Sequence, residues 1–382
     1  MTEVYIIAAV RTPIGVGKPE AGALYPVLPV DLAAHVLREA ARRCGADPSR
    51  VEDVILGCVT PVGDQGANIA RLASLKAGFP THVPAVSLNR MCGSSQQAVH
   101  FAAQAILAGD MDLVIAGGIE MMSHQPLGTD YPKSWPADFP YRLVHQGISA
   151  EMMAELWKLH RQELDDFAFR SHERAGVAIQ SGALAAQIHP VSIPKDDGSV
   201  VKVERDQGVR MPPHREKMAA LPPAFKPDGV VTAGNSSQVS DGAAAIVLAS
   251  EAYVRQTGVA PLARIVARAV VGSDPVLMLD APIPATRMVL ERARLRLDQM
   301  DLIEINEAFA SVVLAWQKET HADFERVNPD GGAIAHGHPL GATGAVLMTK
   351  LVHGLVRRGG RYGLQTMCIG HGMATATVIE RL

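Results

Sequence analysis

Cys92 is the residue whose type and position best suit covalent chemistry. It stands in a Cys-Gly-Ser-Ser turn directly before a mostly apolar run that reads as a helix. The apolar members of that run recur at helical spacing, namely Ala98, Phe101, Ala102, Ala105 and Ile106. The free amide groups and the dipole at a helix N-terminus favour a thiolate over a thiol. Because a packing cysteine is expected on the apolar stripe rather than before it, we interpret Cys92 as a reactive nucleophile.

A second group of reactive side chains lies near the end of the chain. His338 stands in the glycine-rich turn GGAIAHGHPLGATGA, which opens another predicted helix. Cys368 ends an apolar strand, and by its position alone it would be a core residue. Asn306 follows a short predicted strand, and its position alone favours a helix cap. This group therefore offers a histidine for acid/base work, a second thiol and an amide whose roles the residue types leave open.

The elements that must position these residues occur twice in the same order. The first segment contains predicted strands and helices at Val4–Val10, Val30–Cys44, Val51–Cys58 and Asn68–Ala77, followed by the Cys92 helix and a buried strand from Leu113 to Ala116. The pattern recurs from about Ala263, with a helix at Pro284–Leu295 and strands at Asp301–Ile305 and Tyr362–Cys368. We interpret this as two similarly folded α/β halves, in which Cys92 and His338 occupy matching helix starts.

The region between the two halves has a different character. A polar helical run is predicted from Ala150 to Ser181, and a tract rich in proline and charge follows from His189 to Pro227. Asp241–Ser250 then returns to buried-strand character. We predict an insertion that covers the site. The expected division is 1–118 for the N-terminal half, 119–240 for the inserted loop domain, 241–262 for a strand and helix returning to the first half, and 263–382 for the C-terminal half.

Composition and charge narrow the class of protein. The 382 residues predict more than one domain, and the balance of 36 Lys plus Arg against 39 Asp plus Glu excludes a basic nucleic-acid-binding surface. No apolar run approaches membrane-spanning length, and the start MTEVYIIAAVRTP lacks the features of a signal peptide, so we expect no membrane insertion. Four widely spaced cysteines without a CxxC pair predict free thiols and a cytoplasmic location.

Four motifs in order resemble the signatures of the thiolase family. They are NRMCGSSQQAV around Cys92, NEAFA from Asn306, GGAIAHGHPLGATG around His338 and CIGHG from Cys368. Within the insertion, HQGISAE and GNSSQVSDGA resemble the segments that face coenzyme A. The resemblance covers essentially the whole chain. It implies an α/β thiolase fold, in which two similar halves form a five-layered αβαβα core with an inserted loop domain.

The resemblance also implies roles for the reactive residues. Cys92 would carry the acyl group, His338 would accept its proton, and Cys368 would move the proton at the α-carbon of acetyl-CoA. Asn306 would hold a water facing the thioester oxygen, and the backbone amides of Cys92 and Gly370 would form a second oxyanion hole. The resemblance implies that this chemistry needs no metal and no redox cofactor. Coenzyme A takes part in it as a substrate.

The same resemblance implies how the chain meets its partners. Arg210, Ser237, His145 and Gln146 would contact coenzyme A or the acyl substrate, with the arginine suited to a phosphate or to adenine. Acyl-CoA and CoA are thus the expected small-molecule partners. The family also implies a homodimer or a homotetramer.

Other chemistries use some of the same residues. His336, His338, Cys368 and His371 offer the donor types of a zinc site, although a glycine-rich helix start suits an anion equally well. A hydrolase of the Cys-His-Asn type would leave Cys368 and the insertion unused. A non-catalytic thiolase-like protein that binds acyl-CoA would have no need for two placed thiols.

Several positions depart from the family pattern. His371 and Ala374 replace frequent glycines, His336 replaces an aliphatic residue, and Lys217 stands where biosynthetic relatives carry a serine. We expect His336 either to influence His338 and the substrate or to face the surface. Gln146 replaces a methionine typical of biosynthetic members, and the helical run after it is closer to degradative thiolases. We therefore predict an acetyl-CoA C-acyltransferase that cleaves 3-ketoacyl-CoA, with acetoacetyl-CoA synthesis as the alternative. Acyl-chain character, physiological direction and dimer versus tetramer stay open.

Overall fold

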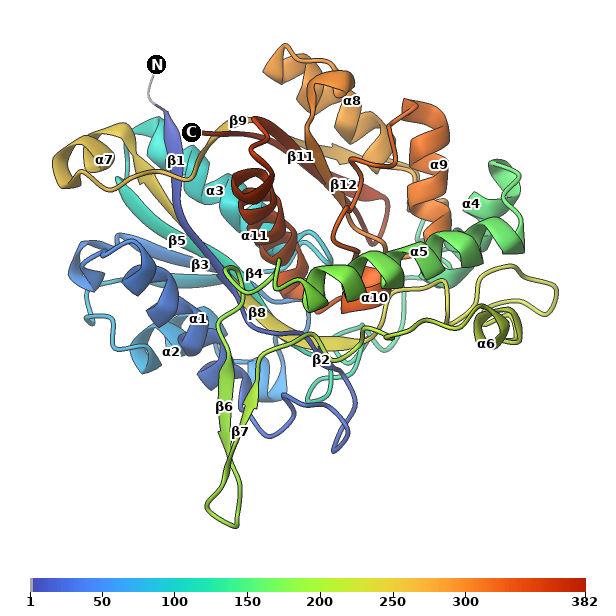
Figure 1. The fold of residues 1–382 in the computed structure, drawn as a ribbon, viewed down its shortest axis with the longest axis horizontal. Helices are drawn as coiled ribbons and strands as arrows, with labels where there is room; N and C mark the ends of the chain where they lie inside the picture. The colour runs from blue at the N-terminus through green and yellow to red at the C-terminus, as the bar shows by residue number, and fades with distance from the viewer. Residues whose placement is uncertain (1–2) are drawn as a thin grey trace.

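The N-terminal half forms one part of a large mixed sheet (Figure 1). The computed structural model describes residues 3–382. The strands of this half are β1 (Val4–Arg11), β2 (Gly15–Val16), β3 (Asp53–Gly57), β4 (Ala85–Leu88), β5 (Leu113–Met121) and β8 (Ser240–Ser250). Their order is β1-β8-β5-β3-β4, with β2 paired to β8. Strands β5 and β8 are buried along their full length, as expected of apolar runs covered on both faces.

The C-terminal half supplies the rest of the sheet. Its strands are β9 (Ala263–Gly272), β10 (Leu302–Ile305), β11 (Tyr362–Ile369) and β12 (Met373–Arg381), in the order β10-β11-β12-β9. Strand β9 pairs with β1 only through Tyr5 with Arg264 and Ile6 with Ala263. This short antiparallel contact joins the two parts into a sheet of ten strands.

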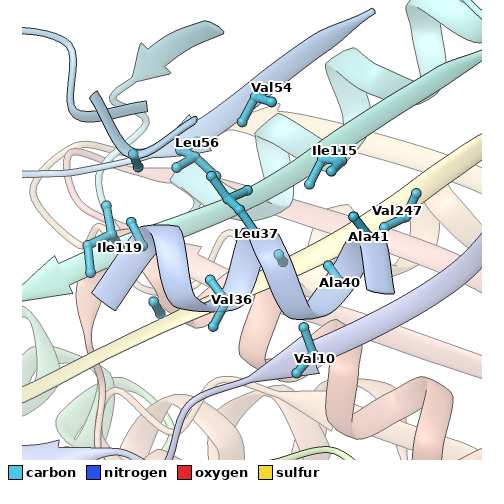
Figure 2. Packing of buried hydrophobic residues seen from close by; sticks show 14 of the residues in the cluster. Val10, Val36, Leu37, Ala40, Ala41, Val54, Leu56, Ile115, Ile119 and Val247 are labelled. Carbon is cyan, nitrogen blue, oxygen red and sulfur yellow. The ribbon is translucent and has the colours of Figure 1, made fainter. Parts of the chain in front are cut away.

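Helices cover both outer faces and fill the space between the two parts of the sheet (Figure 1). The outer helices are α1 (Pro29–Arg43) and α2 (Ile69–Lys76) on the N-terminal half, and α8 (Pro282–Ala293) and α9 (Ala310–Thr320) on the C-terminal half. Figure 2 shows the first of these faces, where Leu37 of α1 lies against Leu56 of β3 and Ile115 of β5. The burial of this apolar stripe fixes α1 on the sheet. Shorter helices are α7 (Glu251–Thr257) and α10 (Ala333–His336), with 3-10 turns at Pro48–Arg50, Gly63–Gln65 and Leu297–Gln299.

The central layer consists of α3 (Ser94–Ala108) and α11 (Leu340–Arg358), which contact each other. Helix α11 contacts strands of both halves, and one apolar cluster joins residues of both halves around these helices. The approach is close, since a Cβ added at Gly344 would lie 2.3 Å from the backbone nitrogen of Gln96. The predicted five-layered αβαβα arrangement is thus confirmed.

The segment between β5 and β8 contributes three helices and a hairpin. These elements are α4 (Gln146–Leu156), α5 (Arg161–Gln180), β6 (Val191–Pro194), β7 (Val200–Val203) and α6 (Arg215–Ala219), and the hairpin projects from the body (Figure 1). The expectation of one helical run from Ala150 to Ser181 is wrong. Lys158 has a positive φ of 52°, and Glu163 accepts the backbone N–H of His160 at 2.7 Å, which starts a new helix.

Most of the other predicted elements differ from the observed ones by one or two residues at their ends, but the strand predicted at Leu113–Ala116 continues to Met121, and β12 (Met373–Arg381) and α9 (Ala310–Thr320) were not predicted. Nor were β2 and β4 predicted. Both are short, and β4 lies at the edge of the sheet, where none of its four residues is fully buried. Among residues 3–382, no helix combines the length and apolar character needed to cross a membrane.

Candidate active site

Cys92 lies in a tight turn just before α3. Met91 has a positive φ of 46°, and the hydroxyl of Ser94 donates to the Met91 carbonyl at 2.6 Å while it accepts the Arg90 N–H at 2.9 Å. A Cβ added at Gly93 would lie 2.3 Å from Cδ1 of Ile369, the last residue of β11. The turn is therefore pressed against the strand that carries Cys368.

The electrostatic surroundings of Cys92 differ from the simple expectation for a helix start. Burial raises the pKa of the Cys92 thiol to about 11, although its own amide and that of Gly370 act in the opposite direction. The residue as a whole retains some exposed surface, but its sulfur is enclosed by protein. The desolvation acts on the sulfur, which is the atom that would carry the charge, and it is the largest influence on this pKa. In the unliganded protein this desolvation favours the thiol over the thiolate expected from the helix start, so a reaction at Cys92 requires a base to take its proton.

The hydrogen bonds of His338 determine which of its ring nitrogens carries the hydrogen. Its Nδ1 lies 2.6 Å from Oγ1 of Thr343, and this hydroxyl donates its own hydrogen to the Pro339 carbonyl at 2.9 Å. The Thr343 oxygen is consequently an acceptor, which places the imidazole hydrogen on Nδ1 and leaves Nε2 unprotonated. Burial lowers the pKa of His338 to about 4, so the ring is neutral at pH 7. A neutral imidazole with an unprotonated Nε2 is a competent general base.

Asn306 lies beside this nitrogen. It is fully buried, and its Nδ2 is 3.3 Å from Nε2 of His338, at the long end of the hydrogen-bond range. Its Oδ1 has no hydrogen-bond partner within the described structure. Helix α9 starts at Ala310 with Phe309 as its N-cap, so the helix-cap interpretation of Asn306 is wrong. A buried amide oxygen without a partner instead favours a bound water or substrate atom.

Cys368 completes the cluster from near the end of β11. It is buried, and both burial and the neighbouring Cys92 raise its pKa above the usual value for a thiol. Leu340, at the start of α11, packs with Cys92. The fold thus brings together Cys92 from the first half and His338, Asn306, Cys368 and Gly370 from the second.

Two separate cavities adjoin the insertion and divide the predicted CoA contacts. Arg210 lines a cavity of about 290 Å³ with His172, His214 and Lys217, which makes its wall basic. His145 and Gln146 line a different cavity of about 360 Å³ that includes Gly370. His145 also caps α4 by accepting the Gly147 N–H at 3.1 Å. Ser237 is not one of the residues that line these two cavities in the described part of the chain. Its backbone amide donates to the Ala308 carbonyl.

Models of the thiolase N-terminal and C-terminal domains match residues 4–252 and 259–381. The chain belongs to the thiolase family. It is 46% identical over 396 residues to a steroid 3-ketoacyl-CoA thiolase of Mycobacterium tuberculosis, covering 100% of this chain and 95% of the relative. It is 44% identical to the 3-oxoadipyl-CoA/3-oxo-5,6-dehydrosuberyl-CoA thiolase of Escherichia coli, with both chains fully covered. A crystal structure of the Bacillus anthracis acetyl-CoA acetyltransferase superposes with a TM-score of 0.93 at 42% identity, covering 100% and 99% of the two chains. The activity of this thiolase is acyl transfer between 3-ketoacyl-CoA and CoA.

The thiolase site relies on supporting residues that sequence reasoning missed. Thr343 orients His338, and the carboxylate of Glu307 accepts hydrogen bonds from Ser171 and Asn328, which holds the Asn306 loop. Glu120 accepts the amide of Gly341 at 2.9 Å and so ties the start of α11 to β5. The sequence motifs could have indicated two of these residues, since Glu307 lies within the NEAFA motif and Thr343 within the glycine-rich turn.

His336, one of the four residues that suggested a zinc site, contacts Asp330 and Asp206 instead. The Nε2 of His336 is 2.8 Å from the Asp330 carbonyl, and its Nδ1 is 2.7 Å from a carboxylate oxygen of Asp206. The same carboxylate pairs with buried Arg11 at 2.7 Å. His336 is buried, so the alternative in which it faces the surface is wrong. Across residues 3–382, no group of three or more His, Cys, Asp or Glu side chains is placed to hold a metal ion.

Proposed function

We propose that this thiolase works in the degradative direction, with Cys92 as nucleophile, His338 as its base and Cys368 as the acid/base group at the α-carbon. The observation that carries the proposal is the hydrogen-bond chain from Pro339 through Thr343 to His338. It leaves Nε2 unprotonated, with its lone pair facing the side-chain amide of Asn306 at 3.3 Å.

The first half-reaction breaks the bond between C2 and C3 of the 3-ketoacyl-CoA. Sγ of Cys92 attacks the C3 carbonyl while its proton passes to Nε2 of His338. The amides of Cys92 and Gly370, which both act on this sulfur, stabilise the alkoxide. As the bond breaks, its electron pair goes to C2 and the thiol of Cys368 protonates that carbon. Acetyl-CoA leaves, Cys92 carries the acyl group, His338 is an imidazolium and Cys368 is a thiolate.

The second half-reaction returns every proton. The incoming CoA thiol gives its hydrogen to the Cys368 thiolate, and the CoA sulfur attacks the acyl group on Cys92. The departing Cys92 sulfur takes the proton from the His338 imidazolium. The open Oδ1 of Asn306 would hold a water that faces the thioester oxygen of acetyl-CoA, which forms the other oxyanion site. No metal and no redox cofactor takes part in these steps.

Substrate length separates the degradative proposal from the biosynthetic alternative. The cavity of about 360 Å³ next to Gly370 supports an acyl group larger than that of acetoacetyl-CoA. The comparison that decides is kcat/KM for acetoacetyl-CoA against longer 3-ketoacyl-CoAs. A preference for acetoacetyl-CoA alone would establish the alternative instead.

The division of labour between the two thiols is tested by intact-protein mass spectrometry after exposure to acetyl-CoA. Cys92→Ala should abolish both the acetyl adduct and turnover. Cys368→Ala should still accept the acetyl group but lose thiolysis by roughly 10²–10⁴-fold, the usual effect of removing general acid–base catalysis. An adduct that persists in Cys92→Ala and disappears in Cys368→Ala would reverse the assignment.

The assembly and location of the enzyme are part of the same proposal. Strand β4 lies at the edge of the sheet, and Val86 on it is 44% exposed, so its unpaired backbone and apolar side chain suit a second copy of the chain. We expect a homodimer or homotetramer, and light scattering that gives a monomer mass at micromolar concentration would contradict this. The four free cysteines favour a cytoplasmic location. Arg210, Ser237, His145 and Gln146 remain the proposed contacts for CoA or substrate.

A further inference from the structure

A cavity beside the nucleophile has a wall of aromatic rings. Its volume is about 360 Å³, and it reaches Gly370, whose amide acts on the sulfur of Cys92. Tyr131 and Trp135 line it together with His371, with ring centroids 6.5 and 6.3 Å from that imidazole. The basic cavity around Arg210 is separate. If Cys92 attacks C3, the acyl group beyond C3 extends away from the CoA portion, and this cavity lies next to Gly370, apart from the cavity lined by Arg210, where such a group would fit.

His371 has two properties that packing does not explain. Its φ of 64° lies in the left-handed region, where glycine is free of strain and a larger residue is uncommon. Its Nδ1 is a buried atom without a hydrogen-bond partner among residues 3–382. A buried polar atom of this kind is satisfied when a ligand supplies the missing partner.

The remaining wall is mostly apolar. It consists of Leu127, Leu143, Val144 and Met278, with glycines at 128 and 370 and the polar side chains of His145 and Gln146. None of the described lining residues is Lys, Arg, Asp or Glu. An acyl chain that ends in a carboxylate would therefore lose its hydration without gaining a cationic partner.

We propose that this cavity selects a neutral acyl group ending in a carbocyclic ring that bears an oxygen, with His371 as the specificity-determining residue that hydrogen-bonds this oxygen. The inference rests on the proposed function, since it names the substrate class of the same site. Aromatic edges and faces pack well against a ring, and the imidazole nitrogen pairs with a hydroxyl or keto oxygen. A site built around one hydrogen bond rejects analogues that lack the partner more strongly than a purely apolar pocket does.

The test compares kcat/KM for 3-ketoacyl-CoAs of matched size. One ends in a hydroxycyclohexyl ring, one in a cyclohexyl ring, one in a straight alkyl chain and one in a carboxylate, with acetoacetyl-CoA as the internal reference. The wild-type enzyme should prefer the hydroxycyclohexyl substrate over the straight chain by about tenfold or more, within the range that one pocket contact supplies. Glycine suits the backbone conformation at position 371. His371→Gly should therefore lower the ratio of kcat/KM for the hydroxycyclohexyl substrate to that for the cyclohexyl substrate by about tenfold. Trp135→Ala should lower kcat/KM for both ring substrates relative to that for the straight-chain substrate.

A matched control is available at His321, an exposed histidine with a φ of 55° at the end of α9. His321→Gly makes the same chemical change outside the cavity. It should leave kcat/KM for all five substrates at the wild-type level. A wild-type preference for the straight chain or the carboxylate overturns the inference, as does an unchanged ratio in His371→Gly. Failure of the proposed function looks different, because Cys92 would then form no adduct with acetyl-CoA and no substrate would turn over.

Discussion

Replacing Thr343 with valine tests the reasoning about His338 most directly. The two side chains have the same shape, but valine cannot accept the hydrogen on Nδ1, which is 2.6 Å from the threonine oxygen. The ring is buried, so water does not take over this contact. The imidazole then either keeps an unsatisfied N–H or moves its hydrogen to Nε2, where it can no longer accept the proton of Cys92.

The magnitude follows from the cost of that lost partner. An unsatisfied buried donor costs about 1–3 kcal/mol, which corresponds to a loss of roughly 5- to 150-fold in kcat/KM at 1.36 kcal/mol per factor of ten. The loss should fall on kcat rather than on KM, because Thr343 acts on the base and not on the substrate. Rapid acetylation of Cys92, followed by quenched mass spectrometry, should slow by the same factor. Thr343→Ser keeps the hydroxyl and should restore most of the rate.

Thr349→Val is the matched control for this experiment. Thr349 is buried on the same helix, and its hydroxyl donates to the Ala345 carbonyl at 2.8 Å, but the hydrogen bonds of its side chain do not include a histidine. It reports what the loss of a buried hydroxyl from α11 does to folding and activity. If Thr343→Val acetylates Cys92 as fast as the Thr349→Val enzyme does, Thr343 does not set the tautomer of His338.

Three other perturbations give separate predictions. Arg210→Ala should raise KM for CoA by roughly tenfold or more with little change in kcat, because charged hydrogen bonds contribute about 1.5–3 kcal/mol; equal KM values in this variant and in an exposed control, Arg205→Ala, would exclude the contact. Gly344→Ala should lower the free energy of unfolding by about 1–3 kcal/mol through overpacking against α3, and a urea midpoint equal to wild type would show that the helices move apart freely. Burial lowers the pKa of His100 to about 3 and that of His338 to about 4, so below about pH 6.5 the unfolded chain binds protons that the folded chain does not. The free energy of unfolding should therefore fall as the pH decreases from 6.5 to 4, and urea midpoints that do not change over this range would contradict the prediction.

Local features of the active site could be predicted from the sequence because they depend on near neighbours. The helix after Cys92 ends at Gly109 with a φ of 83°, as a left-handed cap at that glycine requires. The order of motifs was enough to place both halves in one family. The partners of the polar atoms were not predictable, because they come from distant parts of the chain. Gln96 of α3, for example, hydrogen-bonds Thr375 and Thr377 of β12.

The protonation of Cys92 shows why local rules fail at a buried site. The amides of Cys92 and Gly370 act to lower its pKa, but the larger opposing effect is desolvation by the packed halves around it. The break between α4 and α5 has a similar origin. The run from Ala150 to Ser181 is helical in pattern, and it turns where Trp157 donates from its indole nitrogen to Glu319 of α9 at 3.0 Å. Such tertiary contacts override the local preference.

The catalytic cluster draws one member from the first half of the chain and the others from the second, which has a consequence during synthesis on the ribosome. Cys92 emerges long before Asn306, His338 and Cys368, and β11 with β12 is the last part to be made. Until those strands pack, Cys92 lacks the Gly370 amide and is not enclosed with its proposed base, so we expect a nascent chain to accept no acyl group. A chain that stops before Tyr362 should therefore take no acetyl group from acetyl-CoA, while a small alkylating reagent should modify Cys92 in it faster than in the complete enzyme. Acetylation of the shortened chain at the full rate would show that the first half is competent alone.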